Sequence, residues 1–134
     1  MRAAFLQAHQ DRYKDAQALF KAKRWGGAVY LGGYVIECIL KAKILMNLGS
    51  KNLPKDYWHH DLEKLVRLAG IERRLAEPQN RELRLRMRLI LGEWMVTMRY
   101  GSLQLIDQHA AYRFLKAVQE VKRWVRETIQ ERAT

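Results

Sequence analysis

The chain has 134 residues, of which 25 are basic and 14 are acidic, so its formal net charge is +11. This length fits one domain over residues 1–134, and an apolar content of 49% argues against disorder. We expect no membrane span, no secretory signal and, because Cys38 is the single cysteine, no internal disulfide. The chain is therefore predicted to be cytoplasmic, with a basic surface that attracts phosphate groups.

The first part of the chain shows two helical patterns. Apolar residues at helical spacing predict a helix over residues 8–23, with a break at the Trp-Gly-Gly sequence of residues 25–27. A second helix is predicted over residues 28–48, and its wide apolar surface makes it the central helix of the fold. Gly32 and Gly33 lie inside this helix, where each costs about 1 kcal/mol relative to alanine, so we expect them to permit close approach of another helix.

The second part of the chain is predicted to contain one short helix and two long ones. Residues 50–59 read as a loop, residues 61–69 as a short helix and residues 71–80 as a charged connector. Long helices follow over residues 81–100 and 108–131, the latter with an aspartate as its N-cap. The inner face of the first of these is expected to carry Leu85, Leu89, Gly92 and Val96. The sequence thus predicts an all-α, up-and-down four-helix bundle with one additional short helix.

Two charged residues of the central helix, Glu37 and Lys41, are four positions apart and share one face. A surface ion pair is one interpretation of this spacing. The alternative is a polar pair held near a cleft, because the helix around it is the most apolar of the chain.

His60 and Asp61 stand at the start of the short helix. Capping and packing explain such a pair, and contact with a phosphate or a base is the alternative. Adjacent histidines without a nearby cysteine or glutamate at zinc spacing do not indicate a metal site, and we expect no cofactor.

Arginines recur toward the end of the chain. Arg99 and Tyr100 close the helix over residues 81–100, where an arginine can interact with the last carbonyl groups or, alternatively, hold a phosphate while the tyrosine stacks on a base. Arg81, Arg84 and Arg88 share a helical face, which is either solvated or an attractive surface for a polyanion.

In this order and spacing, these motifs resemble those of HEPN domains, the nucleotide-binding domains of higher eukaryotes and prokaryotes. The stretch over residues 28–42 is similar to the second helix of that family, with Glu37 followed three residues later by Leu-Lys-Ala. The segment from His60 to Leu65 looks like the family's His-x-Leu-x2-Leu element, and Arg99-Tyr100 matches an Arg-Tyr pair that follows the fourth helix.

The resemblance implies a helical bundle that forms homodimers, binds a nucleotide or RNA phosphate, and pairs with a small nucleotidyltransferase in a toxin–antitoxin type of system. Many HEPN proteins are metal-independent ribonucleases that carry an Arg-x4–6-His motif. That motif is not found here, since the next histidine after Arg99 is His109. The resemblance therefore favours the non-nuclease branch, with no catalytic residues expected and His60 and His109 as the weaker catalytic candidates.

Carried over to this sequence, the family's motif positions predict a polar cleft formed by Glu37, Lys41, His60, Arg99 and Tyr100. Lys41 and Arg99 would meet phosphate, Tyr100 would stack on a base or pack in the core, and Glu37 would orient Lys41 or bond a ribose hydroxyl.

Two other functions remain open from the sequence. One is a ribonuclease toxin that uses Arg99 together with His109 or His60, because a histidine base and an arginine are the minimum for cleaving RNA without a metal. The other is a structural homodimer whose charged face docks a partner protein.

Overall fold

A computed structural model describes residues 1–100 and 106–133, with side chains for all of these except residues 95–100 and 131–133. Its long helices are α1 (Arg2–Lys21), α2 (Trp25–Leu48), α5 (Arg81–Tyr100) and α6 (Gln108–Ala133). Between α2 and α5 the chain forms η1 (Lys55–Tyr57), α3 (Leu62–Leu68), α4 (Glu72–Leu75) and η2 (Pro78–Asn80). The described residues contain no strand, so the predicted all-α fold with four long helices is confirmed. The structure has two short α-helices, α3 and α4, where the sequence predicted one.

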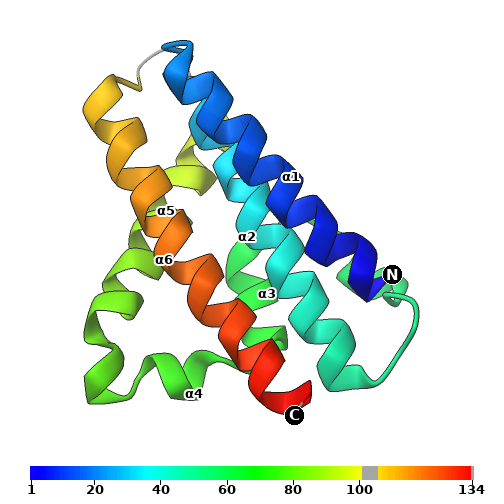
Figure 1. The fold of residues 1–134 in the computed structure, drawn as a ribbon. Coiled ribbons are helices and arrows are strands. Elements are labelled where there is room, and N and C mark those ends of the chain that lie inside the picture. The colour runs from blue at the N-terminus through cyan, green and yellow to red at the C-terminus, as the bar shows by residue number, and fades with distance from the viewer. Residues whose placement is uncertain (101–105, 134) are drawn as a thin grey trace.

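Helix α2 is the central helix, as its apolar surface predicted. It packs against α1, α3, α5 and α6, and Figure 1 shows it running between α1 and α6. Of its 24 residues, 14 are buried, among them Ile36, Ile39 and Leu40. Burial on several sides at once explains why the helix carries almost no exposed polar face. The helix ends at Gly49, whose φ of 63° is readily adopted by glycine.

The turn between α1 and α2 lies elsewhere than predicted. Helix α1 begins at Arg2, where residue 8 was expected, because Phe5 and Leu6 already pack against the core. The glycines of residues 25–27 do not break the chain but occupy the first turn of α2. The turn centres instead on Lys23, which has a φ of 62°, and it is closed by the backbone N–H of Arg24 donating to the carbonyl of Leu19 at 2.8 Å.

The inner face of α5 also differs from the prediction. Met87, Ile90 and Trp94 are buried, whereas Leu85 is 47% exposed and Gly92 is exposed. Leu89 is half-buried, and the Val96 side chain lies outside the described part of the structure. The buried face of α5 is thus rotated relative to the predicted one. Leucine and arginine alternate in the first half of α5, which places apolar residues on more than one face. On the outer side, Arg86 Nε donates to Glu120 Oε2 of α6 at 2.7 Å.

The segment over residues 71–80 is a structured part of the core rather than a plain connector. Ile71 and Leu75, at either end of α4, are buried in the main hydrophobic cluster. Arg84 of α5 donates from Nη1 to the carbonyl of Leu75 at 2.8 Å, which ties α4 to α5. Arg84 is therefore not simply part of a solvated arginine face, while Arg81 and Arg88 are exposed.

Gly32 and Gly33 permit close helix packing, as expected. A Cβ atom at Gly33 would overlap the indole ring of Trp94 from α5. A Cβ atom at Gly32 would lie 3.0 Å from the ring of Phe114 from α6. Trp94 and Phe114, two of the largest buried side chains, thus pack directly against the backbone of α2.

Helix α6 follows the prediction closely. Asp107 caps its first turn, because its Oδ1 accepts from the backbone N–H of Ala110 at 2.8 Å. The helix buries one continuous stripe of apolar residues along α2, which includes Ala111, Phe114, Ala117, Val118, Val121 and Val125. Within the described residues, no helix combines the length and apolarity needed to cross a membrane.

Candidate functional site

A buried carboxylate lies at the centre of the polar cluster on α2. Glu37 is only 5% exposed, and both of its oxygens are bonded. Lys41 Nζ, one turn later on the same helix, donates to Oε2 at 3.1 Å, and His60 Nδ1 lies 2.7 Å from Oε1. Lys41 is itself 7% exposed and its ammonium group lies 6.0 Å from the centre of the Phe5 ring of α1. A buried charge requires such pairing, because desolvation of an isolated carboxylate is costly.

The imidazole of His60 joins this buried pair to the surface. Its side chain is 60% exposed although its Nδ1 bonds to a carboxylate that is nearly fully buried. An ionised carboxylate only accepts hydrogen bonds, so Nδ1 carries the proton. Nε2 is then left as an acceptor in the neutral ring and as a donor in the protonated ring. Glu37 therefore fixes the orientation of the ring and the position of its proton.

Aromatic rings support the cluster from the side of α5. Tyr34 packs edge-on against His60 at 5.7 Å between ring centres and against Trp94 at 5.4 Å. Trp94 Nε1 donates to the carbonyl of Tyr30 at 3.0 Å, and the hydroxyls of Tyr30 and Tyr34 lie 3.3 Å apart. The hydrogen bond with Tyr30 and burial raise the pKa of Tyr34 to about 12, so its hydroxyl stays protonated at neutral pH.

The loop before α3 carries a second exposed ring. Trp58 is 62% exposed, and its Nε1 donates to the carbonyl of Leu53 at 2.7 Å, which fixes the indole although its surface is open. Next to it, His59 Nδ1 accepts from the backbone N–H of Asp61 at 3.2 Å. Burial lowers the pKa of His59, and the charge of Lys64 acts in the same direction. Asp61 then caps α3 by accepting from the N–H of Lys64 at 3.1 Å, so the capping role expected at this helix start belongs to Asp61.

The other predicted site residues lie apart from this cluster or outside the described side chains. Arg99 and Tyr100 form the end of α5, but their side chains are outside the described part of the structure, so their contacts stay a prediction. His109 lies in the first turn of α6, at a surface pocket that it shares with Phe20 and Tyr112. His109 and His60 therefore occupy different surroundings.

The family model of the HEPN domain matches residues 2–128. The chain belongs to the HEPN domain family. No curated protein and no solved structure gives a match. The resemblance inferred from short motifs is thereby confirmed for the family, and membership indicates a function connected with nucleotides or RNA.

In this HEPN domain, three of the five predicted binding residues come together. Glu37, Lys41 and His60 form one bonded cluster although His60 is 23 positions from Glu37. The i,i+4 spacing indicated the pairing of Glu37 with Lys41, while only the family resemblance connected His60 with them. Sequence reasoning missed the roles of Tyr34 and Trp94, because aromatic residues on apolar helices are typical of a core.

Cys38, also on α2, is not a reactive thiol in this HEPN domain. Burial raises its pKa to about 11, and the negative charge of Glu37 acts in the same direction. A thiol with this pKa remains protonated at neutral pH and is a poor nucleophile. Among the described residues, no cluster of histidine, cysteine and acidic side chains is arranged to hold a metal ion.

Proposed function

We propose that this HEPN domain binds a nucleotide or an RNA strand through phosphate, without cleaving it, on the surface around His60. The observation that carries this proposal is the buried Glu37 carboxylate, which aligns the exposed imidazole of His60 while Lys41 balances its charge. Buried charges are costly to maintain, and such arrangements concentrate at functional sites.

His60 is the group that would meet the ligand directly. An imidazole N–H at Nε2 donates to a phosphate oxygen while Nδ1 stays bonded to the Glu37 carboxylate. Lys41 was expected to meet phosphate, but its side chain is buried on Glu37. We therefore propose that Lys41 neutralises the negative charge of Glu37, which would otherwise repel a phosphate.

Trp58 adds a surface for a base. Trp58 lies two positions before His60 in the loop. Its indole is exposed, and its Nε1 is held by the carbonyl of Leu53. Stacking of a base on an aromatic side chain contributes about 1–3 kcal/mol and tolerates any base. Arg99 and Tyr100, from the end of α5, are proposed to add a phosphate contact and a second stacking surface.

The proposed lack of cleavage rests on the histidines. Metal-free RNA cleavage uses a general base and a general acid at one phosphate. His9 is fully buried, His59 has its Nδ1 bonded to the backbone of Asp61, and His109 lies at another pocket. None of these three is therefore arranged as a partner for His60 in the described part of the chain.

Binding of a labelled single-stranded RNA at two salt concentrations tests this proposal. We expect His60→Ala and Trp58→Ala each to weaken binding about tenfold, which is a loss of about 1.4 kcal/mol. Arg99→Ala should abolish most of the remaining affinity and leave the fold intact. His109→Ala is the matched control and should bind normally. Three results together would mean only that a basic protein attracts polyanions. These are equal competition by inorganic triphosphate, loss of binding at moderate salt, and no effect of the variants.

A ribonuclease is the second candidate, and the Glu37–His60 pair favours it, because a carboxylate that orients a histidine also prepares a general base. Incubation with structured RNA in the presence of a chelator separates the two functions. Cleavage that disappears in His60→Ala would support the ribonuclease and contradict the non-catalytic proposal. Cleavage that disappears only in His109→Ala would move the catalytic site to the start of α6. Cleavage that persists in both variants would indicate a contaminant.

We also propose that the domain acts as a homodimer in the cytoplasm and pairs with a small nucleotidyltransferase in a toxin–antitoxin type of system. Dimers and RNA ligands are frequent among HEPN domains, which supports the first of these statements. Analytical ultracentrifugation should give twice the monomer mass of 15.9 kDa. A monomer that binds RNA would contradict the dimer, and a dimer that binds a partner protein but no RNA would favour the structural role.

A further inference from the structure

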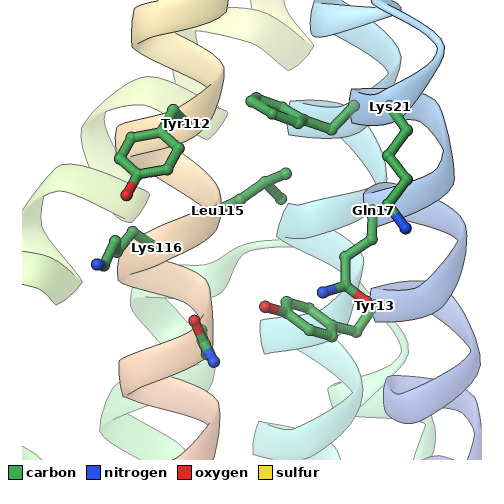
Figure 2. A pocket seen from close by; sticks show the side chains of 8 residues that line it. Tyr13, Gln17, Lys21, Tyr112, Leu115 and Lys116 are labelled. Carbon is green, nitrogen blue, oxygen red and sulfur yellow. The ribbon is translucent and has the colours of Figure 1, made fainter.

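A pocket lies between α1 and α6, away from the Glu37 cluster. Both helices pack mainly on α2 and touch each other little, which leaves a cavity of about 260 Å³ between them (Figure 2). Helix α1 supplies four of the eight lining side chains and α6 supplies the other four. These residues are Tyr13, Gln17, Phe20, Lys21, Tyr112, Leu115, Lys116 and Gln119.

The floor of the pocket is apolar and firmly packed. Leu115 is 8% exposed and belongs to a small buried cluster with Ala16 of α1 and Ala28 of α2. Its Cδ2 comes within 3.1 Å of where a Cβ of Gly32 would lie, so the missing side chain of this glycine lets the leucine sink toward α2. In Figure 2, Leu115 points into the space between the two helices.

Aromatic rings form the walls. Tyr13 of α1 and Tyr112 of α6 line the pocket from opposite helices, and in Figure 2 Tyr13 extends into the gap while the ring of Tyr112 lies against α6. Phe20 lies 6.4 Å from Tyr112 between ring centres, and it packs edge-on against Trp25 at 5.0 Å. Tyr112 is 52% exposed, which leaves a large ring surface open to contact.

The charge around the pocket is positive. Lys21 and Lys116 line it from opposite helices, and none of its eight lining residues is acidic. Lys116 lies 5.8 Å from the ring centre of Tyr112, and Lys122 lies 4.4 Å from that of Tyr13. The amides of Gln17 and Gln119 can each donate and accept a hydrogen bond at a polar ring edge.

We propose that this pocket binds a small anion that carries a planar aromatic ring. The ring packs on Leu115 beside Tyr13 and Tyr112, and the anionic group meets the ammonium groups of Lys21 and Lys116. The volume is near the lower limit for ligand sites, which suits a single ring system with one charged group. Because the pocket contains no residue of the Glu37 cluster, this proposal does not depend on the function proposed for His60.

Two kinds of molecule share this chemistry, a nucleoside monophosphate and an aromatic carboxylate. Adenosine 5′-monophosphate and indole-3-acetate are suitable probes for them. Ribose 5-phosphate, which lacks the ring, and adenosine, which lacks the charge, are the matched controls.

The four tryptophans allow the site of binding to be located by NMR of their indole N–H groups. Trp25 contacts Phe20 of the pocket, whereas Trp58 lies in the loop of His60 and Trp94 lies beside Tyr34. We expect one of the two aromatic anions to shift the Trp25 signal in a saturable manner, with at least tenfold weaker binding of both controls. A response to the nucleotide alone or to the carboxylate alone would identify which source the pocket prefers.

Substitutions at the exposed rim keep the test independent of folding. The double variant Lys21→Gln and Lys116→Gln and, separately, Tyr112→Ala should each weaken binding at least tenfold. Lys14→Gln with Lys51→Gln removes the same charge from exposed positions outside the pocket and should have no effect. The proposal is overturned if ribose 5-phosphate or adenosine binds equally well, if the pocket variants bind normally, if only Trp58 responds, or if no probe shifts Trp25.

Discussion

Glu37 and His9 are both buried polar side chains, yet their surroundings satisfy them very differently. Glu37 in α2 has a bonded partner for each of its oxygens, one of them an exposed imidazole. His9 in α1 is fully buried, and neither of its ring nitrogens has a hydrogen-bond partner among the described residues. Burial of a polar group without a partner costs free energy, whereas a paired group fixes the geometry around it.

The comparison separates two regions of the same small core. The region of Glu37, Tyr34 and Trp94 is tightly packed and holds an exposed histidine in one orientation. The region between α1 and α6 contains the open pocket and His9, whose ring nitrogens lack hydrogen-bond partners within the described part of the chain. The positive charge of Lys122 on α6 acts on His9. The first region thus pairs its buried charge, while the second leaves a buried polar group without a partner in the part that the structure describes.

The largest effect is expected from breaking the Glu37 cluster. In Glu37→Gln, the buried ammonium group of Lys41 loses its counter-charge, so the free energy of unfolding should fall by about 3 kcal/mol. Asp15→Asn is the control, because Asp15 forms an exposed pair with Arg12 and should change stability by less than about 0.5 kcal/mol. Urea denaturation measures both values, and equal small losses would contradict the importance assigned to the buried pair.

The packing of the first region can be tested at two glycines. Gly33→Ala would place a methyl group into the Trp94 indole and should lower the free energy of unfolding by about 2 kcal/mol or more. Gly92 in α5 is exposed, with no described atom within 4 Å of an added Cβ. Gly92→Ala should therefore raise stability by about 0.5–1 kcal/mol through helix propensity alone. Thermal unfolding of the two variants should show opposite signs.

The second region is expected to respond to pH through His9. Burial lowers the pKa of His9 below its ordinary 6.5, and Lys122 and Arg126 act in the same direction. The carbonyl groups of Leu6 and Phe5 act against this shift, but neither makes a hydrogen bond of normal geometry with the ring. The unfolded chain then takes up a proton at higher pH than the folded chain. Stability should be full above pH 6.5 and should decrease as the pH falls toward the lowered pKa.

His9→Leu tests this directly. The variant should be more stable than the parent by about 1 kcal/mol at pH 7, because it removes an unsatisfied polar group, and by more at pH 5. Burial also lowers the pKa of His59, so the variant His59→Asn measures how much His59 contributes to the pH dependence of stability. If the parent and His9→Leu lose stability equally on acidification, His9 does not control the acid sensitivity.

The smallest effect is expected at the hydroxyl pair beside the cluster. Tyr30→Phe removes a hydrogen bond of 3.3 Å and should cost about 0.5–1 kcal/mol. It should also lower the pKa of Tyr34 from about 12, because the bond with Tyr30 is the main cause of its elevation. Carbon NMR of Tyr34 over an alkaline titration measures this pKa. An unchanged value would show that burial alone is responsible.

Strong patterns in the sequence predicted much of the fold. The apolar repeats gave the four long helices, and Asp107 gave the start of α6. The α1–α2 turn was placed wrongly because Lys23 adopts a left-handed φ that usually requires glycine. The face of α5 was misjudged because its leucines and arginines alternate, so tertiary packing decides which side faces inward.

The candidate site was predictable only where its geometry is local. Helical spacing predicts the pairing of Glu37 with Lys41, but no local rule brings His60 to Glu37 across 23 positions. His9 could not have been identified as a core residue, because histidine is usually at least partly exposed. The pocket between α1 and α6 depends on how two helices diverge over α2, which side-chain patterns do not encode.

The central position of α2 has a consequence for synthesis in the cell. Its apolar surface is covered most extensively by α1 and next by α6, and α6 ends 85 residues after α2 does. At translation rates of about 5–20 residues per second, α2 waits roughly 4–17 s for that partner to be made. During this interval a nascent chain presents its most apolar helix with only α1 and the short helices to shield it. The HEPN domain is thus expected to depend on chaperones while it is being translated more than its small size suggests.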